Sequence, residues 1–175
     1  MNNVKREVDL HFLQHYRHDL MNELQIILGF LQMNNEEQVN NKLNEVLTQL
    51  ECERKLLALY MPKFAYWILM FNHMNSEFNL KYNINIETPL KKFDEQLTND
   101  CKQFFDIVYK YVDIAKTHSF TVSLKPSSKD IFKVSFEINH LLQDKEFQAI
   151  CHNKLQVRNL NFEHKEQLIC EWTYR

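Results

Sequence analysis

Apolar side chains recur at helical spacing over the first third of the chain and predict two helices. From about Val8 to Met33, a single stripe follows a step of three or four residues: Leu13, Leu20, Leu24, Ile27 and Leu31. Met33 to Glu36 is typical of a turn, because its two asparagines suit capping and left-handed positions. The second helix has a heptad-like seam: Val39, Leu43, Val46, Leu50 and Leu57. The pair predicts an antiparallel hairpin that buries its seams by joining a second hairpin in a dimeric four-helix bundle.

The hydrophobic pattern changes at Met61-Pro62, where we expect a domain boundary: residues 1–61 form the hairpin and residues 62–175 a second domain. Lys63 to Phe71 is apolar on every side and predicts a buried helix. Phe78 to Glu87 alternates and predicts a half-buried strand. Helical spacing returns from about Glu95 to Lys116.

The hydrophobic pattern over the last third of the chain predicts mainly strands. Phe120 to Leu124 and Phe132 to Ile138 both alternate, with Lys125 to Asp130 as the loop of a β-hairpin. Lys145 to His152 carries a weak helical signal, and Gln167 to Tyr174 predicts a closing strand. The fold class is therefore α+β, with a helical hairpin followed by an α/β sandwich of four strands.

Composition narrows the class of protein. With 45% hydrophobic and 25% charged residues among 175, the chain can bury an ordinary globular core. A net charge of −2 without a long basic run argues against nucleic acid as a partner, and the longest apolar run is too short to span a membrane. The cysteines are scattered and suit reduced thiols in the cytoplasm better than disulfides or zinc: Cys52, Cys101, Cys151 and Cys170.

The single glycine of the chain, Gly29, excludes several kinds of phosphate site. Gly-rich cradles need glycines where the backbone approaches phosphate oxygens or adopts positive φ. A P-loop, a dinucleotide fingerprint and the glycine boxes of a histidine-kinase ATP site are all absent from this sequence. We therefore expect no nucleotide cofactor of the chain's own.

One histidine stands out on the first helix. His18 lies roughly 150° from the centre of the apolar stripe, so its imidazole should face solvent. Asn22 lies one turn along the same face, Gln25 two turns and Gly29 about three. A surface histidine is most often a solvated residue without a role. Metal is a second alternative, because His11 and His15 share that face, although no carboxylate or cysteine completes a tetrahedral set.

The whole string around His18 favours a third interpretation. Arg17-His18-Asp19-x-x-Asn22-x-Leu24-Gln25 resembles the phospho-acceptor motif of two-component histidine kinases, and more narrowly that of the sporulation initiation phosphotransferase B family. The close match runs from about Tyr16 to Gln32. By this resemblance His18 carries phosphate, and Asp19 and Asn22 are its catalytic neighbours. The second domain then resembles a kinase ATP-binding domain that keeps the shape without the ATP chemistry.

The resemblance implies a phosphorelay phosphotransferase that passes a phosphoryl group between response-regulator aspartates through a phosphohistidine, in sporulation. The partners would be receiver domains, which would bring their own Mg²⁺, and a second copy of the chain. Gln14, Arg17, Gln25 and Gly29 complete the exposed strip that a receiver would contact. A receiver-domain phosphatase and a non-catalytic dimeric adaptor that use the same helical face remain the alternatives.

Overall fold

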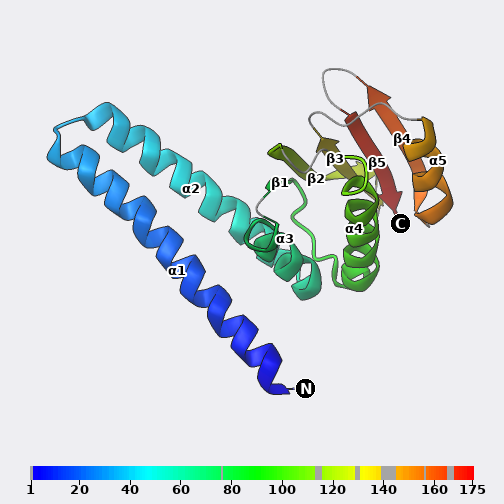
Figure 1. Cartoon of the computed structure of the whole chain (residues 1–175), viewed down its shortest axis with the longest axis horizontal. Helices are drawn as coiled ribbons and strands as arrows, with labels where there is room; N and C mark the ends of the chain where they lie inside the picture. The colour runs from blue at the N-terminus through cyan, green and yellow to red at the C-terminus, as the bar shows by residue number, and fades with distance from the viewer. Residues whose placement is uncertain are drawn as a thin grey trace. The chain divides into compact units, whose positions relative to one another are not determined.

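The computed structural model describes residues 2–75, 77–112, 116–128, 131–138, 145–155, 157–164 and 168–175, with the side chains of 2–12, 145 and 164 left aside. The chain packs as two compact units, Met1–Glu53 and Arg54–Arg175, and each is described by itself. The elements in chain order are drawn in Figure 1: α1 (Asn2–Gln32), α2 (Glu36–Ala58), α3 (Pro62–Met74), β1 (Phe78–Ile84), the 3₁₀ helix η1 (Lys91–Phe93), α4 (Asp94–Val108), β2 (His118–Ser128), β3 (Ile131–Ile138), α5 (Lys145–Lys154), β4 (Arg158–His164) and β5 (Leu168–Tyr174).

The first unit is the predicted helical hairpin. Helix α1 begins at Asn2, six residues before the predicted start at Val8. The turn uses its asparagines as the sequence suggests. Asn34 adopts a positive φ of 54°, and the Asn35 side chain accepts a hydrogen bond from the backbone N–H of Gln38, which caps α2.

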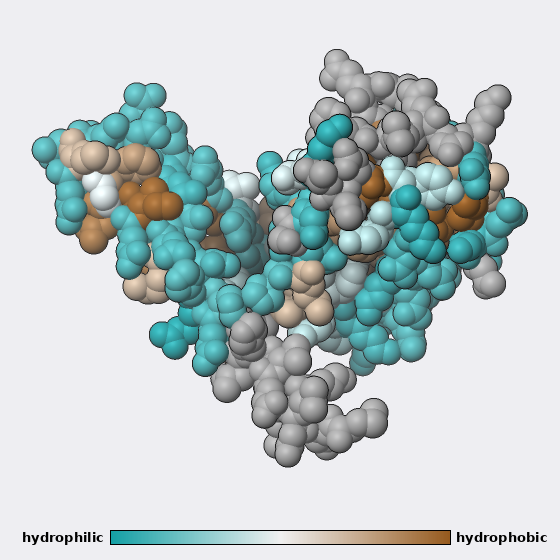
Figure 2. All heavy atoms as spheres, in the orientation of Figure 1, coloured by the Kyte–Doolittle hydropathy of each residue, from teal (hydrophilic) through white to brown (hydrophobic). Residues whose placement is uncertain are grey.

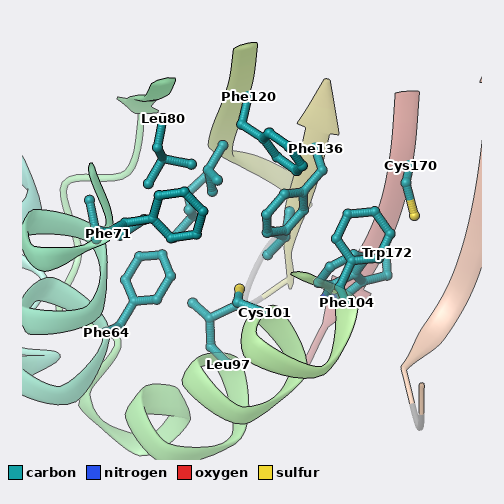
Figure 3. Packing of buried hydrophobic residues seen from close by; sticks show 14 of the residues in the cluster. Phe64, Phe71, Leu80, Leu97, Cys101, Phe104, Phe120, Phe136, Cys170 and Trp172 are labelled. Carbon is teal, nitrogen blue, oxygen red and sulfur yellow. The ribbon is translucent and has the colours of Figure 1, made fainter. Parts of the chain in front are cut away.

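The second unit is a sheet covered on one face by helices. Its strands lie in the order β1-β2-β3-β5-β4, with β1 parallel to β2 and the other neighbours antiparallel. Figure 3 shows Phe64 and Phe71 of α3 and Leu97, Cys101 and Phe104 of α4 facing the sheet residues Leu80, Phe120, Phe136 and Trp172. These largely aromatic side chains form the core of the unit, between the helices and the sheet. The packing of helices on a mixed sheet confirms the α+β class.

Two side chains of this unit tie elements together through backbone groups. Asp94, at the start of α4, accepts hydrogen bonds from the N–H groups of Lys63 and Phe64 and so caps α3 across a gap of about thirty residues in sequence. Asn72, on α3, donates to the carbonyl of Leu80 and accepts from its N–H, at 2.9 and 2.6 Å. The amide of Asn72 thus takes the place of a neighbouring strand at the edge of β1.

Several predicted boundaries in this unit are wrong. The expected loop Lys125 to Asp130 is largely strand, because β2 continues to Ser128 and Pro126 pairs with Phe132; residues 129–130 lie outside the described part. Helix α4 ends at Val108 rather than near Lys116, since the backbone hydrogen bonds then change to i→i−3: Lys110 N–H donates to Ile107 O and Tyr111 N–H to Val108 O. The predicted sandwich lacked a strand, because β4 (Arg158–His164) was not foreseen. Gln167, the expected start of the last strand, lies outside the described residues.

The predicted buried helix is present as α3, with one side open to solvent. Phe64, Ile68 and Phe71 are buried, whereas Tyr66 and Met74 are exposed. The four cysteines are free thiols: Cys101, Cys151 and Cys170 are buried, and Cys52 on α2 is half-buried. Among the described residues, no helix is long and apolar enough to cross a membrane.

Candidate phospho-acceptor site on the first helix

Helix α1 presents His18 to solvent, as its position opposite the apolar stripe predicts. The side chain is 72% exposed and that of Asp19 is 78% exposed. The Nδ1 atom of the imidazole lies 3.2 Å from Asn22 Nδ2 and 3.5 Å from Asp19 Oδ1. Within the described part of the chain, both polar contacts of the ring are made through Nδ1. The opposite nitrogen, Nε2, therefore faces outward.

The two neighbours of Nδ1 favour different forms of the ring. A neutral imidazole carries one proton, on Nδ1 or on Nε2. The Asp19 carboxylate can only accept, so it favours the Nδ1–H form and leaves the lone pair on Nε2. The Asn22 amide, with its nitrogen toward the ring as assigned, favours the opposite form; with its oxygen toward the ring, it also accepts from Nδ1–H. An Nδ1–H ring, with its lone pair on Nε2, is the form that can act as a nucleophile through Nε2.

The expected docking strip lies along the same helix. Gln14, Arg17 and Gln25 are exposed and Gly29 is partly exposed. A Cβ added at Gly29 would meet nothing within 4 Å, so packing inside the chain does not require glycine there. Glycine costs about 1 kcal/mol relative to alanine inside a helix. The exposed strip is therefore low at Gly29 because the residue has no side chain, and not because neighbouring atoms exclude one.

The described residues contain no group of three or more His, Cys, Asp or Glu side chains placed to hold a metal ion. His15 is half-buried beside His18, and the side chain of His11 lies outside the described residues. In the second unit, Asp106 and Lys110 near the end of α4 are both exposed.

Polar contacts between α1 and α2 were missed by the sequence interpretation. The Tyr16 hydroxyl donates to Glu53 Oε2 at 2.6 Å, and Gln49 Nε2 donates to Glu53 Oε1 at 3.2 Å. The hydrogen bond to the Glu53 carboxylate raises the pKa of Tyr16 to about 12. A signal was available, because Glu53 falls between Leu50 and Leu57 at a position where the heptad seam calls for an apolar residue.

A second contact joins the helices beyond His18. Lys42 Nζ lies 2.5 Å from Glu23 Oε2 and 3.2 Å from Glu45 Oε2. Hydrogen bonds to the two carboxylates raise the pKa of Lys42 above its ordinary value and keep the ammonium charged, and Glu23 has the larger effect. Ion pairs across a helical hairpin are hard to foresee from sequence because they need the axial register of the two helices.

Family models match both parts of the chain. The alpha-helical domain of the SpoOB-type sensor kinases matches residues 2–59, and the C-terminal domain of sporulation initiation phosphotransferase B matches residues 60–173. The chain belongs to the sporulation initiation phosphotransferase B family. This confirms the resemblance drawn from the motif around His18. The predicted domain boundary between residues 61 and 62 stays a prediction.

Individual relatives of this family member can be compared in more detail. Sporulation initiation phosphotransferase B of Bacillus subtilis (strain 168) is 30% identical over 122 residues, which are 69% of this chain and 64% of the relative. The match thus spans less than two thirds of the relative's length. Among solved structures, the blue-light activated histidine kinase EL346 of Erythrobacter litoralis aligns with 95% of this chain and 59% of its own, at 12% identity and a TM-score of 0.46.

Proposed function

We propose that this member of the phosphotransferase B family carries a phosphoryl group on His18 Nε2 between the aspartates of two response-regulator receiver domains. The observation that supports it most is the placement of the ring, with Nδ1 toward Asp19 and Asn22 and Nε2 toward solvent. Because the side chain is 72% exposed, a protein donor can reach the ring from solvent. The four free thiols agree with the reducing cytoplasm as the place of action.

The proposed step needs little from this chain beyond the nucleophile and its orientation. The Nε2 lone pair attacks the phosphorus of an aspartyl phosphate; the new N–P bond forms as the P–O bond breaks, and the donor aspartate leaves as a carboxylate. The product ring is an imidazolium with its proton on Nδ1. Asp19 stabilises that positive charge from 3.5 Å, and the reverse sequence delivers the phosphoryl group to a second aspartate.

The remaining site residues are assigned to orientation and docking. Asn22 orients the ring through Nδ1, and Gln14, Gln25 and Gly29 contact the receiver, with Arg17 close to the phosphate charge. The Mg²⁺ that phosphoryl transfer requires would come with the receiver, as the family resemblance implies. Gly29 suits this role because a small residue lets a partner's backbone come close.

We also propose that the protein acts as a homodimer. Six leucines of the hairpin are between 38% and 58% exposed and form what we call the leucine stripe: Leu13, Leu24 and Leu31 on α1, and Leu43, Leu47 and Leu50 on α2. Hydrophobic side chains gather near the tip of the hairpin in Figure 2. Pairing two stripes in a four-helix bundle would remove these leucines from water.

Phosphoryl transfer from pre-charged receivers tests the relay. Receiver domains charged on aspartate with labelled phosphate are mixed with the wild type and with His18→Ala, and ATP alone serves as a second donor. We expect acid-labile label on the wild type from a receiver, none from ATP and none on His18→Ala. His15→Gln is the matched control, because it alters a neighbouring histidine of the same helix, and it should label normally.

Other outcomes favour the alternatives. Label on His18 followed by release of inorganic phosphate, without onward transfer, would indicate a receiver phosphatase. Label arriving directly from ATP would contradict the absence of a nucleotide site. A wild type that binds receivers but takes no label from any of them would support the adaptor.

A further inference from the structure

A carboxylate is buried in the apolar seam of the hairpin. Glu53 on α2 is only 9% exposed, although the seam residues around it are chiefly aliphatic. Burying a carboxylate is costly unless hydrogen bonds compensate it, and replacing such a group with a well-packed apolar residue is often neutral or stabilising. Stability alone therefore gives no reason for a glutamate at this position.

The contacts of Glu53 link it to the helix that carries His18. Tyr16 reaches across from α1 and donates to Oε2 at 2.6 Å, while Gln49 donates to Oε1 at 3.2 Å. Tyr16 lies about 160° around the helix from His18, and about 3 Å below it along the axis. The hydrogen bond therefore holds the face of α1 opposite the proposed phospho-acceptor.

The contact on the other side of His18 completes the arrangement. Glu23 lies about 140° around the helix from His18 and about 7.5 Å above it, and it pairs with Lys42 of α2. Leu20, between Tyr16 and Glu23, and Ile27, one turn beyond Glu23, are half-buried apolar residues of the same stripe. Apolar contacts are non-directional and allow rotation, whereas hydrogen bonds and ion pairs fix one register.

We infer that Tyr16 and Glu53 are positioning residues for phosphoryl transfer, which fix the rotation of α1 against α2 so that His18 Nε2 meets a docked aspartyl phosphate in line. The inference rests on the proposed function, because the reaction concerned is the phosphoryl transfer proposed above. An imidazole at a radius of about 6 Å moves by about 1 Å for each 10° of helix rotation. A misplacement of that size costs up to about a hundredfold in rate.

The variant Tyr16→Phe tests whether the Tyr16–Glu53 hydrogen bond positions His18 without affecting the reactivity of the imidazole. The variant keeps the ring and loses only the hydroxyl, so we expect kcat for transfer from a charged receiver to fall about tenfold with little change in KM. Labelling of His18 by phosphoramidate, a small donor that needs no docking, should stay at the wild-type rate. Glu53→Gln keeps an acceptor for Tyr16 and should retain most of the activity.

Two control variants separate positioning from stability. Val46→Ala removes a buried apolar group from the same seam and should lower the melting temperature at least as much as Tyr16→Phe, with a smaller loss of kcat. Tyr60→Phe removes the hydroxyl of an exposed tyrosine and should change neither quantity. Equal kcat losses in Val46→Ala and Tyr16→Phe, wild-type kcat in Tyr16→Phe, or slower phosphoramidate labelling would each overturn the inference.

A measurement without receivers tests the geometry independently of the proposed function. Spin labels are placed on Cys52 of α2 and on a Gln25→Cys variant of α1, with unlabelled chain in excess. The distribution of distances between the two labels should be narrow in the protein that retains Tyr16 and broader when Tyr16→Phe is added. It should stay narrow when Val46→Ala is added. If no receiver labels the wild type but the distribution broadens, the relay fails while the positioning contact stands; an unchanged distribution overturns the contact's role.

Discussion

His18 and its neighbours show how much a single residue's surroundings can be predicted from helical geometry. The outward direction of the ring follows from 100° per residue, and the contact of Asn22 with Nδ1 follows from the spacing of four. The Tyr16–Glu53 hydrogen bond does not follow in this way, because its partners are 37 residues apart and meet only once the helices are in register.

Asp100 is a second residue whose surroundings only the fold reveals. Its carboxylate is buried, and Tyr174 at the C-terminal end of β5 donates to it at 2.5 Å. Trp172 Nε1 in turn donates to the Tyr174 hydroxyl at 3.0 Å. Burial raises the pKa of Asp100 above its ordinary value, and the hydrogen bond from Tyr174 lowers it in part.

The raised pKa makes the stability of the second unit depend on pH. The folded state holds the proton of Asp100 more tightly than the unfolded chain, so this contribution is complete below about pH 4 and is lost as the pH rises through the folded-state pKa. Asp100→Asn keeps an acceptor for Tyr174 and does not ionise. We therefore expect the variant to gain stability relative to the wild type between about pH 4 and pH 7.

Urea unfolding midpoints of both proteins at several pH values measure this difference. Asp106→Asn, an exposed carboxylate near the end of the same helix, is the control and should follow the wild type. Parallel pH profiles for the wild type and Asp100→Asn would contradict the prediction.

At the scale of helices and strands, the sequence predicts which of them form better than it predicts the residues at which they end. The hairpin, α3 and the strands with strict alternation are present. Pro126 looked like part of a loop, yet it lies in β2 at a position where a neighbouring register shift accommodates it. Strand β4 was missed because its polar residues, such as Asn159 with its positive φ, weaken the alternation around Leu160 and Phe162.

The edge of β1 supplies a prediction at this scale. Asn72 makes two hydrogen bonds to the backbone of Leu80, and each is worth about 1 kcal/mol net. Asn72→Ala should therefore destabilise the protein by about 2 kcal/mol and uncover backbone groups that attract another strand. Chemical unfolding measures the first effect, and light scattering as a function of protein concentration measures the second.

Asn79→Ala is the matched control for this edge, because Asn79 is an exposed asparagine on β1 itself. It should change the free energy of unfolding by less than Asn72→Ala and leave the scattering unchanged. Equal effects of the two substitutions would show that general strand propensity, and not the hydrogen bonds of Asn72, is responsible.

At the scale of the whole molecule, the leucine stripe decides the expected oligomeric state. A fully buried leucine contributes about 1.5–3 kcal/mol. The double variant Leu24→Lys with Leu47→Lys places two charges in each copy's stripe, so we expect the dimer to weaken by at least a factor of about a hundred. Sedimentation at micromolar concentration should then give a monomer.

Asn40→Lys serves as the control, since it adds the same charge at an exposed polar position of α2. It should sediment like the wild type. A wild type that is monomeric at these concentrations, or a double variant that remains dimeric, would refute the paired-hairpin arrangement.

If His18 carries a phosphoryl group as proposed, the exposure of its side chain limits how long that group lasts. Its side chain is 72% exposed, and both of its polar contacts with described residues are made at Nδ1. A phosphoramidate at Nε2 would therefore be open to attack by water. The charged protein would then be a short-term carrier whose output depends on how soon the next receiver arrives, so receiver abundance, more than any closing motion of this chain, would set the flux.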